Sequence, residues 1–317
     1  MIRRLEFHIS YECRQHCLFC SEADRLKRWK GSPVTPAEMA RVLAEKRRQG
    51  FDHVTFTGGE PTLVTGLEGV LRAAKGLGYA TYMTSNGSRL HEPAFAKRIL
   101  PLLDELCLSV HGPDPALHDA LCGTPGGFER LRMALALAGS REGLFLLTNT
   151  VVVRGNWDRL PAVLGFILGH KGVQHILLSH PAPEGRSAKD YASLAVPFKE
   201  WKRAVPGLAS QARAKGVTLR FFGLPLCVLG AHAVLSNDLY FSPRVTVERG
   251  RVQGKPGLVE ITSLKPTRRR VQPEVCSGCS VRDLCGGVFE RHLEEFGDAD
   301  LAPIKGPKAA AVTEQQA

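Results

Sequence analysis

The feature that most constrains this chain is a regular alternation of strand-like and helix-like segments between residue 5 and about residue 222. Short apolar runs, such as those at 53–57 and 145–153, alternate with longer stretches of helical spacing. About seven such units follow one another. Parallel strands need long crossovers, which are usually helices, so the pattern predicts an α/β fold with a parallel sheet and helices outside it.

The same periodicity fits either a full or partial barrel or an open doubly wound sheet. In both architectures the functional site lies at the carboxyl ends of the strands. The helical region at 199–215 contains Pro206, which predicts an interruption there. The alternation therefore predicts the location of a functional site but not its chemistry.

Beyond residue 222 the pattern changes to short strands separated by glycine and proline turns, with three cysteines between 276 and 285. This texture predicts a smaller α+β unit at 223–300, following a first domain at 1–222. The last segment, 301–317, has little to bury and is predicted to be a disordered tail.

The composition indicates a globular protein, since 44% of the residues are hydrophobic. No secretory signal or membrane-length apolar run is present, which predicts a cytoplasmic protein without a membrane partner. The nine cysteines are then expected to be metal ligands or thiols rather than disulfides. A net charge of +11 favours an anionic partner, but no RNA-reading motif is present and a nucleic acid is not expected.

Three of the cysteines, Cys13, Cys17 and Cys20, stand within eight positions directly after the first strand. Thiolates suit iron–sulfur clusters and zinc, and three of them leave one metal position open for a small molecule. A zinc site completed by His16, or cysteines without a metal, are the alternatives.

The segment "CRQHCLFC" matches the CxxxCxΦC signature, and "TGGEPTL" follows the second strand. With these two motifs in this order the chain resembles the radical S-adenosylmethionine (radical SAM) superfamily. The resemblance implies a partial (β/α)6-type TIM barrel and a 4Fe–4S cluster on Cys13, Cys17 and Cys20. S-adenosylmethionine would bind the fourth iron, and its reductive cleavage would produce a 5′-deoxyadenosyl radical that abstracts a hydrogen atom.

The resemblance also implies cofactor contacts for eight residues of this sequence. Phe19 would pack near the adenine, and Gly58, Gly59 and Glu60 would meet the methionine ammonium. Ser85 and Asn86 would line the ribose side. Ser109 and Asn149 end the fourth and fifth strands, where the family has polar contacts, although ordinary strand-end capping is the alternative.

A second cysteine group lies near the end of the chain, at Cys276, Cys279 and Cys285, with Cys227 just after the last barrel strand. It resembles the C-terminal extension of SPASM and twitch radical SAM enzymes. A full SPASM unit carries about seven cysteines, so four imply a twitch-like unit with one auxiliary 4Fe–4S cluster. A four-cysteine zinc ribbon is the alternative. Without Cys227 as a ligand, the cluster would keep an open iron for substrate.

The position of further residues in the sequence predicts their roles. Cys107 is expected to be a buried small side chain, whereas Cys122 is a candidate catalytic thiol near the barrel mouth. The polar residues expected to shape that mouth are His111, His118 and Asp119. The candidate anion contacts for substrate are His180 and Arg186.

The resemblance implies C–H activation on a peptide or small metabolite, with an external one-electron donor such as flavodoxin or ferredoxin. No leader-binding module precedes the barrel segment, which favours a peptide presented by a separate protein, or a small substrate. A nucleotide- or cofactor-biosynthesis reaction is the alternative enzyme function. A non-catalytic, metal-stabilised binding protein is the alternative outside enzymes, and the "GGE" segment speaks against it.

Overall fold

A single nine-stranded sheet organises the protein, whose computed structural model describes residues 2–306. The strand order is β7-β6-β5-β4-β3-β2-β1-β8-β9, and all neighbours are parallel except the hairpin pair β8–β9. The strands are β1 (Arg4–Ser10), β2 (His53–Gly58), β3 (Ala80–Ser85), β4 (Glu105–Ser109), β5 (Phe145–Val151), β6 (Val173–Ser179), β7 (Thr218–Phe222), β8 (Arg244–Val252) and β9 (Lys255–Ser263). A small second sheet pairs β10 (Arg270–Val271) with β11 (Val288–Phe289).

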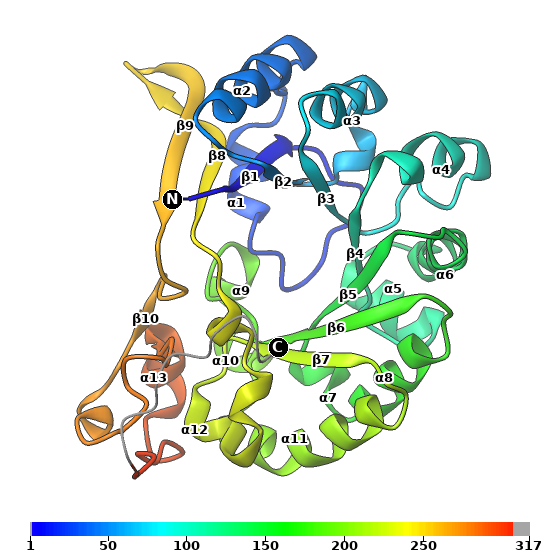
Figure 1. Cartoon of the computed structure of the whole chain (residues 1–317). Helices are drawn as coiled ribbons and strands as arrows, with labels where there is room; N and C mark the ends of the chain where they lie inside the picture. The colour runs from blue at the N-terminus through cyan, green and yellow to red at the C-terminus, as the bar shows by residue number, and fades with distance from the viewer. Residues whose placement is uncertain (1, 307–317) are drawn as a thin grey trace.

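Helices line the outside of the curved sheet (Figure 1). The longer ones are α2 (Pro36–Arg48), α3 (Leu67–Gly76), α4 (Pro93–Ile99), α5 (Pro115–Cys122), α6 (Gly127–Gly139), α8 (Leu160–Leu168) and α11 (Phe198–Arg213). The shorter ones are α1 (Ala23–Arg28), α7 (Arg154–Trp157), α9 (Arg186–Lys189), α10 (Tyr191–Leu194), α12 (Leu226–Leu229) and α13 (Glu290–Phe296). Short 3-10 segments occur at Pro61–Leu63, Leu100–Leu102, Gly230–Leu235, Asn237–Tyr240 and Glu274–Cys276, and Gly230–Leu235 is kinked at His232. The predicted α/β fold with a partial-barrel sheet is thus confirmed.

The helix boundaries follow local sequence chemistry in one place and depart from it in another. Thr35 caps α2 in a reciprocal capping box with Glu38, and Pro36 occupies the first turn. The predicted interruption at Pro206 is wrong, because α11 continues through it. Pro206 is exposed while Trp201 and Val205 are buried, so packing of the inner face outweighs the lost hydrogen bond.

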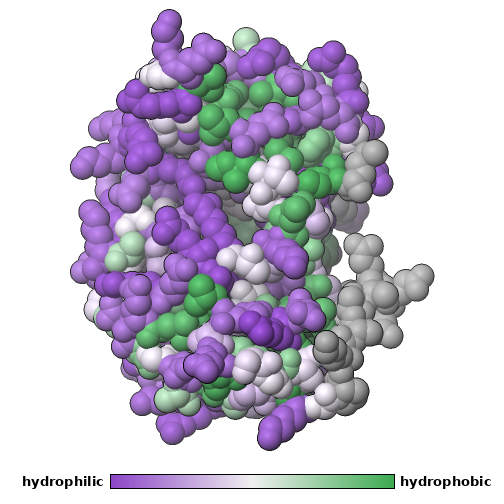
Figure 2. All heavy atoms as spheres, turned by 90° about the vertical axis from the view of Figure 1, so that its left-hand side faces the viewer, coloured by the Kyte–Doolittle hydropathy of each residue, from purple (hydrophilic) through white to green (hydrophobic). Residues whose placement is uncertain are grey.

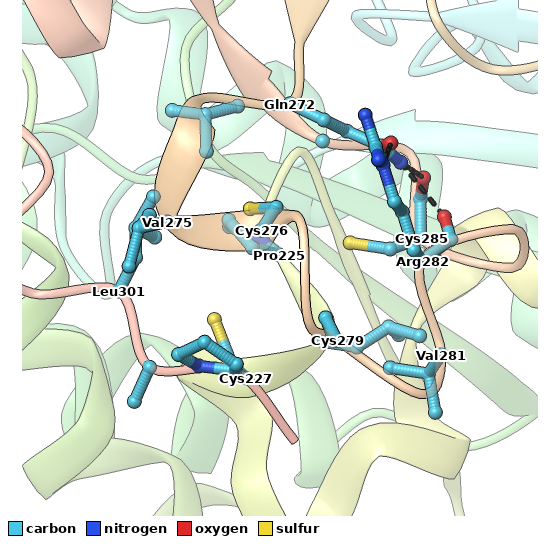
Figure 3. A pocket seen from close by; sticks show the side chains of 15 residues that line it. Pro225, Cys227, Gln272, Val275, Cys276, Cys279, Val281, Arg282, Cys285 and Leu301 are labelled. Carbon is cyan, nitrogen blue, oxygen red and sulfur yellow. Dashed lines mark hydrogen bonds between the residues drawn. The ribbon is translucent and has the colours of Figure 1, made fainter. Parts of the chain in front are cut away.

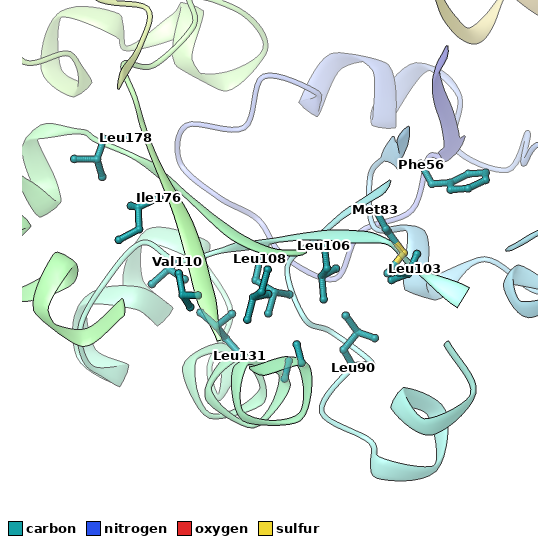
Figure 4. Packing of buried hydrophobic residues seen from close by; sticks show 14 of the residues in the cluster. Phe56, Met83, Leu90, Leu103, Leu106, Leu108, Val110, Leu131, Ile176 and Leu178 are labelled. Carbon is teal, nitrogen blue, oxygen red and sulfur yellow. The ribbon is translucent and has the colours of Figure 1, made fainter. Parts of the chain in front are cut away.

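The hydrophobic core lies between the sheet and its outer helices. Figure 4 shows strand residues such as Met83, Leu106 and Ile176 within this cluster, all fully buried. The opposite face of the strands carries polar side chains, including a Thr84–Thr57 hydroxyl hydrogen bond of 2.9 Å. The inner side of the curved sheet is therefore polar and the outer side apolar.

The hairpin β8–β9 extends the barrel sheet beyond β1. Strand β8 pairs in parallel with β1 from Arg4↔Arg244 to Phe7↔Val247. Residues of the predicted 223–300 unit thus continue the sheet of the predicted 1–222 domain. Figure 2 shows the face carrying this hairpin, which is largely hydrophilic with scattered apolar side chains.

The last described residues, 301–306, pack against the second cysteine group. Leu301 is buried, and both the amide and the hydroxyl of Ser280 donate to the Ile304 carbonyl at 2.9 Å. The disordered tail predicted from residue 301 therefore does not begin there, and residues 307–317 lie outside the described part. Within the described residues, no helix is both long enough and apolar enough to cross a membrane.

Candidate functional site

The three-cysteine loop at 11–20 follows β1 and is fastened on one side by the end of α5. The His16 amide donates to the Cys122 carbonyl at 2.8 Å, and the Leu18 amide donates to the Leu121 carbonyl at 3.0 Å. These backbone bonds bring the loop and a helix end some hundred residues later into direct contact. The three thiols, Cys13, Cys17 and Cys20, are all half-buried and free.

On its other side the loop is held by the segment that follows β6. The Arg186 amide donates to the Cys20 carbonyl and its guanidinium donates to the Cys17 carbonyl, both at 3.0 Å. The Ser187 hydroxyl donates to the Phe19 carbonyl at 2.9 Å. Arg186 therefore supports the cysteine loop, and it also lines a cavity beside Cys13 and Cys20, so its predicted contact with substrate stays a prediction.

Burial and hydrogen bonding give the three thiols different acidities. Burial raises the pKa of Cys13 to about 12 and that of Cys20 to about 11. A hydrogen bond from Cys122 lowers the pKa of Cys17 below its usual value. The side-chain Nδ2 of Asn86 lies 3.4 Å from the Cys13 sulfur and donates to it. Soft, half-buried sulfur donors of this kind fit an iron–sulfur cluster, whose positive irons favour the thiolate form.

The "GGE" segment after β2 is hydrogen-bonded through its backbone to the start of the same loop. The Gly59 amide donates to the Ser10 carbonyl and the Glu60 amide to the Glu12 carbonyl, both at 2.7 Å. A Cβ at Gly58 would lie 2.2 Å from the Ser10 carbonyl oxygen, and one at Gly59 would lie 2.3 Å from the Glu12 carbonyl oxygen. The two glycines are required by this close backbone approach.

The Glu60 carboxylate is fully buried and fully hydrogen-bonded. It accepts from the Thr62 amide (3.0 Å) and hydroxyl (2.6 Å), the Ser85 hydroxyl (2.7 Å) and the Asn86 amide (2.7 Å). Burial raises the pKa of Glu60, although each of these donors favours the charged form. Three of these bonds reach Oε1 and one reaches Oε2, so both oxygens of the carboxylate are engaged. Glu60 therefore joins the ends of β2 and β3, and Thr62 is a partner that sequence reasoning missed.

The remaining predicted cofactor contacts lie at strand ends or in the core. Ser109 and Asn149 are paired neighbours at the ends of β4 and β5, and the side-chain Oδ1 of Asn149 accepts from the Ser179 hydroxyl at 2.7 Å. Phe19 is buried with its ring edge against His111, at 4.6 Å between centroids. Phe19 thus packs between the loop and the strand ends.

The residues predicted to shape the barrel mouth contact the cysteine loop and the neighbouring helices. Cys122 is fully buried, and its candidate catalytic role stays a prediction. Its sulfur lies 3.5 Å from His118 Nε2. Asp119 accepts from the Gly126 and Phe128 amides at 2.6 and 2.7 Å, which fixes the start of α6. Cys107 is buried, as predicted.

His180 was predicted to be an anion contact, and the structure contradicts this. Its ring is buried and its Nε2 lies 3.0 Å from the Tyr191 hydroxyl and 3.2 Å from His292 Nδ1. Burial, with the charges of His292 and Arg270, holds the pKa of His180 well below its usual value. A neutral histidine in an aromatic cluster cannot bind an anion by charge.

A cavity of about 790 Å³ lies on the polar side of β1 and β2, against the hairpin β8–β9. Its charged lining includes Glu6, His8, Glu22, Arg25 and Glu248. Arg25 contacts both Glu22, at 2.7 Å, and Glu248, at 3.3 Å, so the carboxylates are paired. The alternating polar residues of "LEFHIS" could have predicted that this strand lines a polar cavity, but sequence reasoning did not use that pattern.

The second cysteine group lines one small cavity, with a volume of about 20 Å³. Cys227, Cys276, Cys279 and Cys285 surround it (Figure 3). Gln272 pins the cysteine segment by donating to the carbonyls of Arg282 and Cys285, at 2.7 and 3.0 Å. The short segment Leu301, Ala302 and Pro303 completes the lining, which sequence reasoning also missed.

Four thiols around one space form a donor set that fits a fully ligated cluster. Burial raises the pKa of both Cys276 and Cys285. Among residues 2–306, no three histidine, cysteine, aspartate or glutamate side chains converge as ligands of a single metal ion. Neither cysteine group is thus preformed around one ion.

Comparisons with known proteins agree with this geometry. The family model described as "Radical SAM superfamily" matches residues 7–167, which is half of the chain. SuiB from Streptococcus suis bound to S-adenosylmethionine superposes with a TM-score of 0.59 at 16% identity, over 78% of this chain and 58% of SuiB. SuiB bound to its precursor peptide SuiA gives 0.56 at 18% identity, over 70% and 48%.

At these identities the likeness to SuiB shows a shared fold, and the chain spans only about half of SuiB's length. The family match rests on the stretch that carries both the cysteine loop and the "GGE" segment. The chain therefore belongs to the radical SAM superfamily, a family of enzymes.

Proposed function

We propose that this enzyme cleaves S-adenosylmethionine reductively and uses the resulting radical to abstract a hydrogen atom from a peptide or small-molecule substrate. The observation that carries the proposal is the three-thiol loop, braced on both sides and joined directly to the "GGE" segment. Cys13, Cys17 and Cys20 would hold three irons of a 4Fe–4S cluster. When bound, that cluster supplies one electron to the sulfonium of S-adenosylmethionine.

The protein's own residues would position the cofactor rather than take part in the electron transfer. Because the Glu60 carboxylate is occupied by Thr62, Ser85 and Asn86, we assign the methionine ammonium chiefly to backbone carbonyls of the "GGE" segment. The Glu60 carboxylate would contribute negative charge near the ammonium without contacting it directly. Asn149 and Ser109 would complete the polar strand-end surface that faces the cofactor.

The cavity beside β1 is a candidate for the substrate site, because it combines charged and neutral polar groups over a volume suited to a small ligand or a peptide side chain. A peptide substrate is favoured by the shared fold with SuiB, which has been captured with its precursor peptide. A nucleotide- or cofactor-biosynthesis reaction is the second candidate. The cell compartment would be the cytoplasm, with flavodoxin or ferredoxin as the electron donor.

We further propose that Cys227, Cys276, Cys279 and Cys285 hold one auxiliary 4Fe–4S cluster in a twitch-like unit. Because all four line the same cavity, every iron would have a protein ligand. A fully ligated cluster has no open position for substrate, so its role would be electron transfer.

The radical chemistry is tested by anaerobic reconstitution with dithionite and S-adenosylmethionine, followed by chromatography for 5′-deoxyadenosine. The wild-type chain should release this product, and a variant with Cys13, Cys17 and Cys20 all changed to alanine should release none. Equal amounts from both proteins would refute the proposal. Cys107→Ala serves as the matched control, since Cys107 is a buried strand residue outside both cysteine groups.

The auxiliary cluster is tested by iron content. The wild-type chain should bind about eight irons, as two cubane clusters require. Cys227→Ala should lose iron or change the spectrum of the second cluster, while the triple variant should keep about four irons. An unchanged iron content and spectrum in Cys227→Ala would remove Cys227 from the ligand set, and tightly bound zinc in place of iron would favour a zinc ribbon.

A further inference from the structure

A second cavity of about 790 Å³ lies beside the cysteine loop, and two of the three loop cysteines, Cys13 and Cys20, are among its lining residues. Within the described residues it shares no lining residue with the β1 cavity, and none of the eight residues assigned to S-adenosylmethionine lines it. Helix α1 contributes to both cavities, because Arg25 lines the β1 cavity whereas Leu26 and Lys27 line this one. The cysteine loop is therefore accessible from a side that neither the proposed substrate site nor the proposed cofactor contacts occupy.

The lining of this second cavity is strongly basic. Its cationic side chains are Arg14, Lys27, Lys30, Arg89, Arg186 and Lys189, and its carboxylates are only Glu12 and Asp24. Arg89 lies 3.4 Å from Glu92, but among residues 2–306 the other five cations have no carboxylate within 4.0 Å. Four of those five, all except Arg186, are exposed. Because their charges are not neutralised within the protein, this basic cavity should attract an anionic partner.

Arg186 connects the basic cavity directly to the cysteine loop. Its guanidinium donates to the Cys17 carbonyl and its amide donates to the Cys20 carbonyl, both at 3.0 Å. A partner that pairs with the cations of the basic cavity is therefore brought against the cysteine loop itself.

The lining favours an acidic protein over a nucleic acid. Proteins that bind single-stranded nucleic acids combine a basic groove with aromatic rings on which the bases stack. Tyr11 is the only phenylalanine, tyrosine or tryptophan in the lining, and it is buried with its hydroxyl accepting from the Arg249 amide. Without an exposed ring, the basic cavity offers charge but no stacking surface, and complementary charge is what steers the association of two proteins.

We propose that the basic cavity is the docking site of an acidic one-electron carrier protein, which delivers its electron to the cluster proposed at Cys13, Cys17 and Cys20. The inference rests on that proposed cluster. In this step the reduced carrier loses one electron and the cluster gains it, so no bond forms or breaks. Electron transfer slows steeply with distance, and a carrier docked here approaches two of the cysteines without displacing substrate or S-adenosylmethionine. The exposed lysines Lys27, Lys30 and Lys189 are then the contacts for the carboxylates of the carrier.

The docking is tested by anaerobic titration calorimetry of the reconstituted full chain with oxidised flavodoxin, an acidic carrier that in this form has no electron to deliver. The triple variant Lys27→Glu, Lys30→Glu, Lys189→Glu should bind about tenfold more weakly or worse, because like charges then face each other. Added salt should weaken the binding of wild type. The matched control is Lys171→Glu, Lys202→Glu, Lys215→Glu, which changes the net charge equally at exposed positions that line neither cavity.

Release of 5′-deoxyadenosine separates docking from the radical chemistry. With dithionite, which needs no docking site, both triple variants should match wild type. With reduced flavodoxin, only the variant of the basic cavity should lose product several-fold. If wild type releases no product with either reductant, the proposed radical chemistry fails, and the calorimetry still decides the docking.

Three calorimetric results would overturn the inference: wild-type affinity in the variant of the basic cavity, an equal loss in the matched control, or failure of wild type to bind either flavodoxin or an acidic ferredoxin. Displacement of flavodoxin by an RNA oligonucleotide that binds more tightly would also overturn it. If the glutamate variant does not hold iron, glutamine at the same three positions replaces it, and unchanged affinity in that variant refutes the docking site.

Discussion

At the scale of single residues, His8 lies between two carboxylates of the β1 cavity. Its Nε2 lies 3.4 Å from the Glu6 carboxylate and its Nδ1 lies 3.5 Å from that of Glu22. Burial alone would lower the pKa of His8, but the hydrogen bonds and charges of Glu22 and Glu6 outweigh it and raise that pKa to about 9. The pKa of Glu6 is lowered to about 2 by His8 and Arg244, against the effect of burial.

A pH dependence of stability follows from His8. Its pKa is higher in the folded protein than the usual value of 6.5, so the stabilisation is complete below pH 6.5 and is lost as the pH rises through 9. Over that range the free energy of unfolding should fall by on the order of 3 kcal/mol more in wild type than in His8→Gln. Anaerobic urea unfolding at several pH values measures this, and parallel curves for the two proteins would contradict it.

The residues that sequence could predict are those whose chemistry is encoded in local spacing. Cys13, Cys17 and Cys20 share one loop, and Gly58 and Gly59 stand in one turn, so their placement needed no tertiary information. Cys122 and His180 were assigned to substrate because they follow strands or helices near the mouth. Their burial depends on which segments pack over them, and spacing carries no information about that.

At the scale of elements, the segment between β6 and α9 acts as a brace for the cysteine loop. Gly185 allows this, with φ 58° and ψ −125°, a conformation that side chains disfavour. A Cβ there would lie 2.4 Å from the Cys20 carbonyl oxygen and 2.6 Å from that of Ser21. The contact is between backbones, so it cannot be relieved by moving a side chain.

Gly185→Ala should therefore push the brace away from the cysteine loop. The expected cost is about 2 kcal/mol or more of stability, together with a several-fold loss of iron from the loop cluster on reconstitution. Gly216→Ala is the matched control, because Gly216 has φ 66° but no atom within 4 Å of an added Cβ. Iron analysis and thermal unfolding compare them, and equal iron in both variants would show that the brace does not support the site.

Most elements of the sheet could be predicted, because the strands are apolar runs separated by helical spacing. The partner of β8 could not be predicted, since its alternating sequence suits a hairpin in either domain. Only the tertiary fold reveals that β8 pairs with β1. The continuity of α11 through Pro206 was missed for a similar reason, because long-range packing decided it.

At the scale of the whole molecule, Arg249 joins the hairpin to the first part of the barrel. Its guanidinium contacts both carboxylate oxygens of Glu38 at 2.9 and 2.8 Å and donates to the Ser32 carbonyl at 3.2 Å and to the Pro33 carbonyl. Arg249 is 8% exposed, so these bonds are largely shielded from water. They connect β8 to the segment that leads into α2.

Arg249→Met should keep the length of the side chain but leave these acceptors without their donor. The expected loss is about 2–3 kcal/mol of unfolding free energy, since the remaining carboxylate and carbonyls lose charge-assisted bonds. Arg72→Met, which removes an exposed pairing with Glu68, should cost no more than about 0.5 kcal/mol. Anaerobic denaturation curves measure both, and similar losses would mean that the hairpin is not anchored through Arg249.

The fastening of the cysteine loop also sets an order of events during synthesis of the chain. Residues 11–20 leave the ribosome first, but their braces come from residues 121–122 and 185–187. The cavity of the second cysteine group is completed later, because its lining residues run from Pro225 to Pro303. Cellular iron donors would therefore meet a loose, oxygen-sensitive thiol segment until more than half of the chain is made, and the proposed auxiliary cluster would be inserted later than the proposed loop cluster.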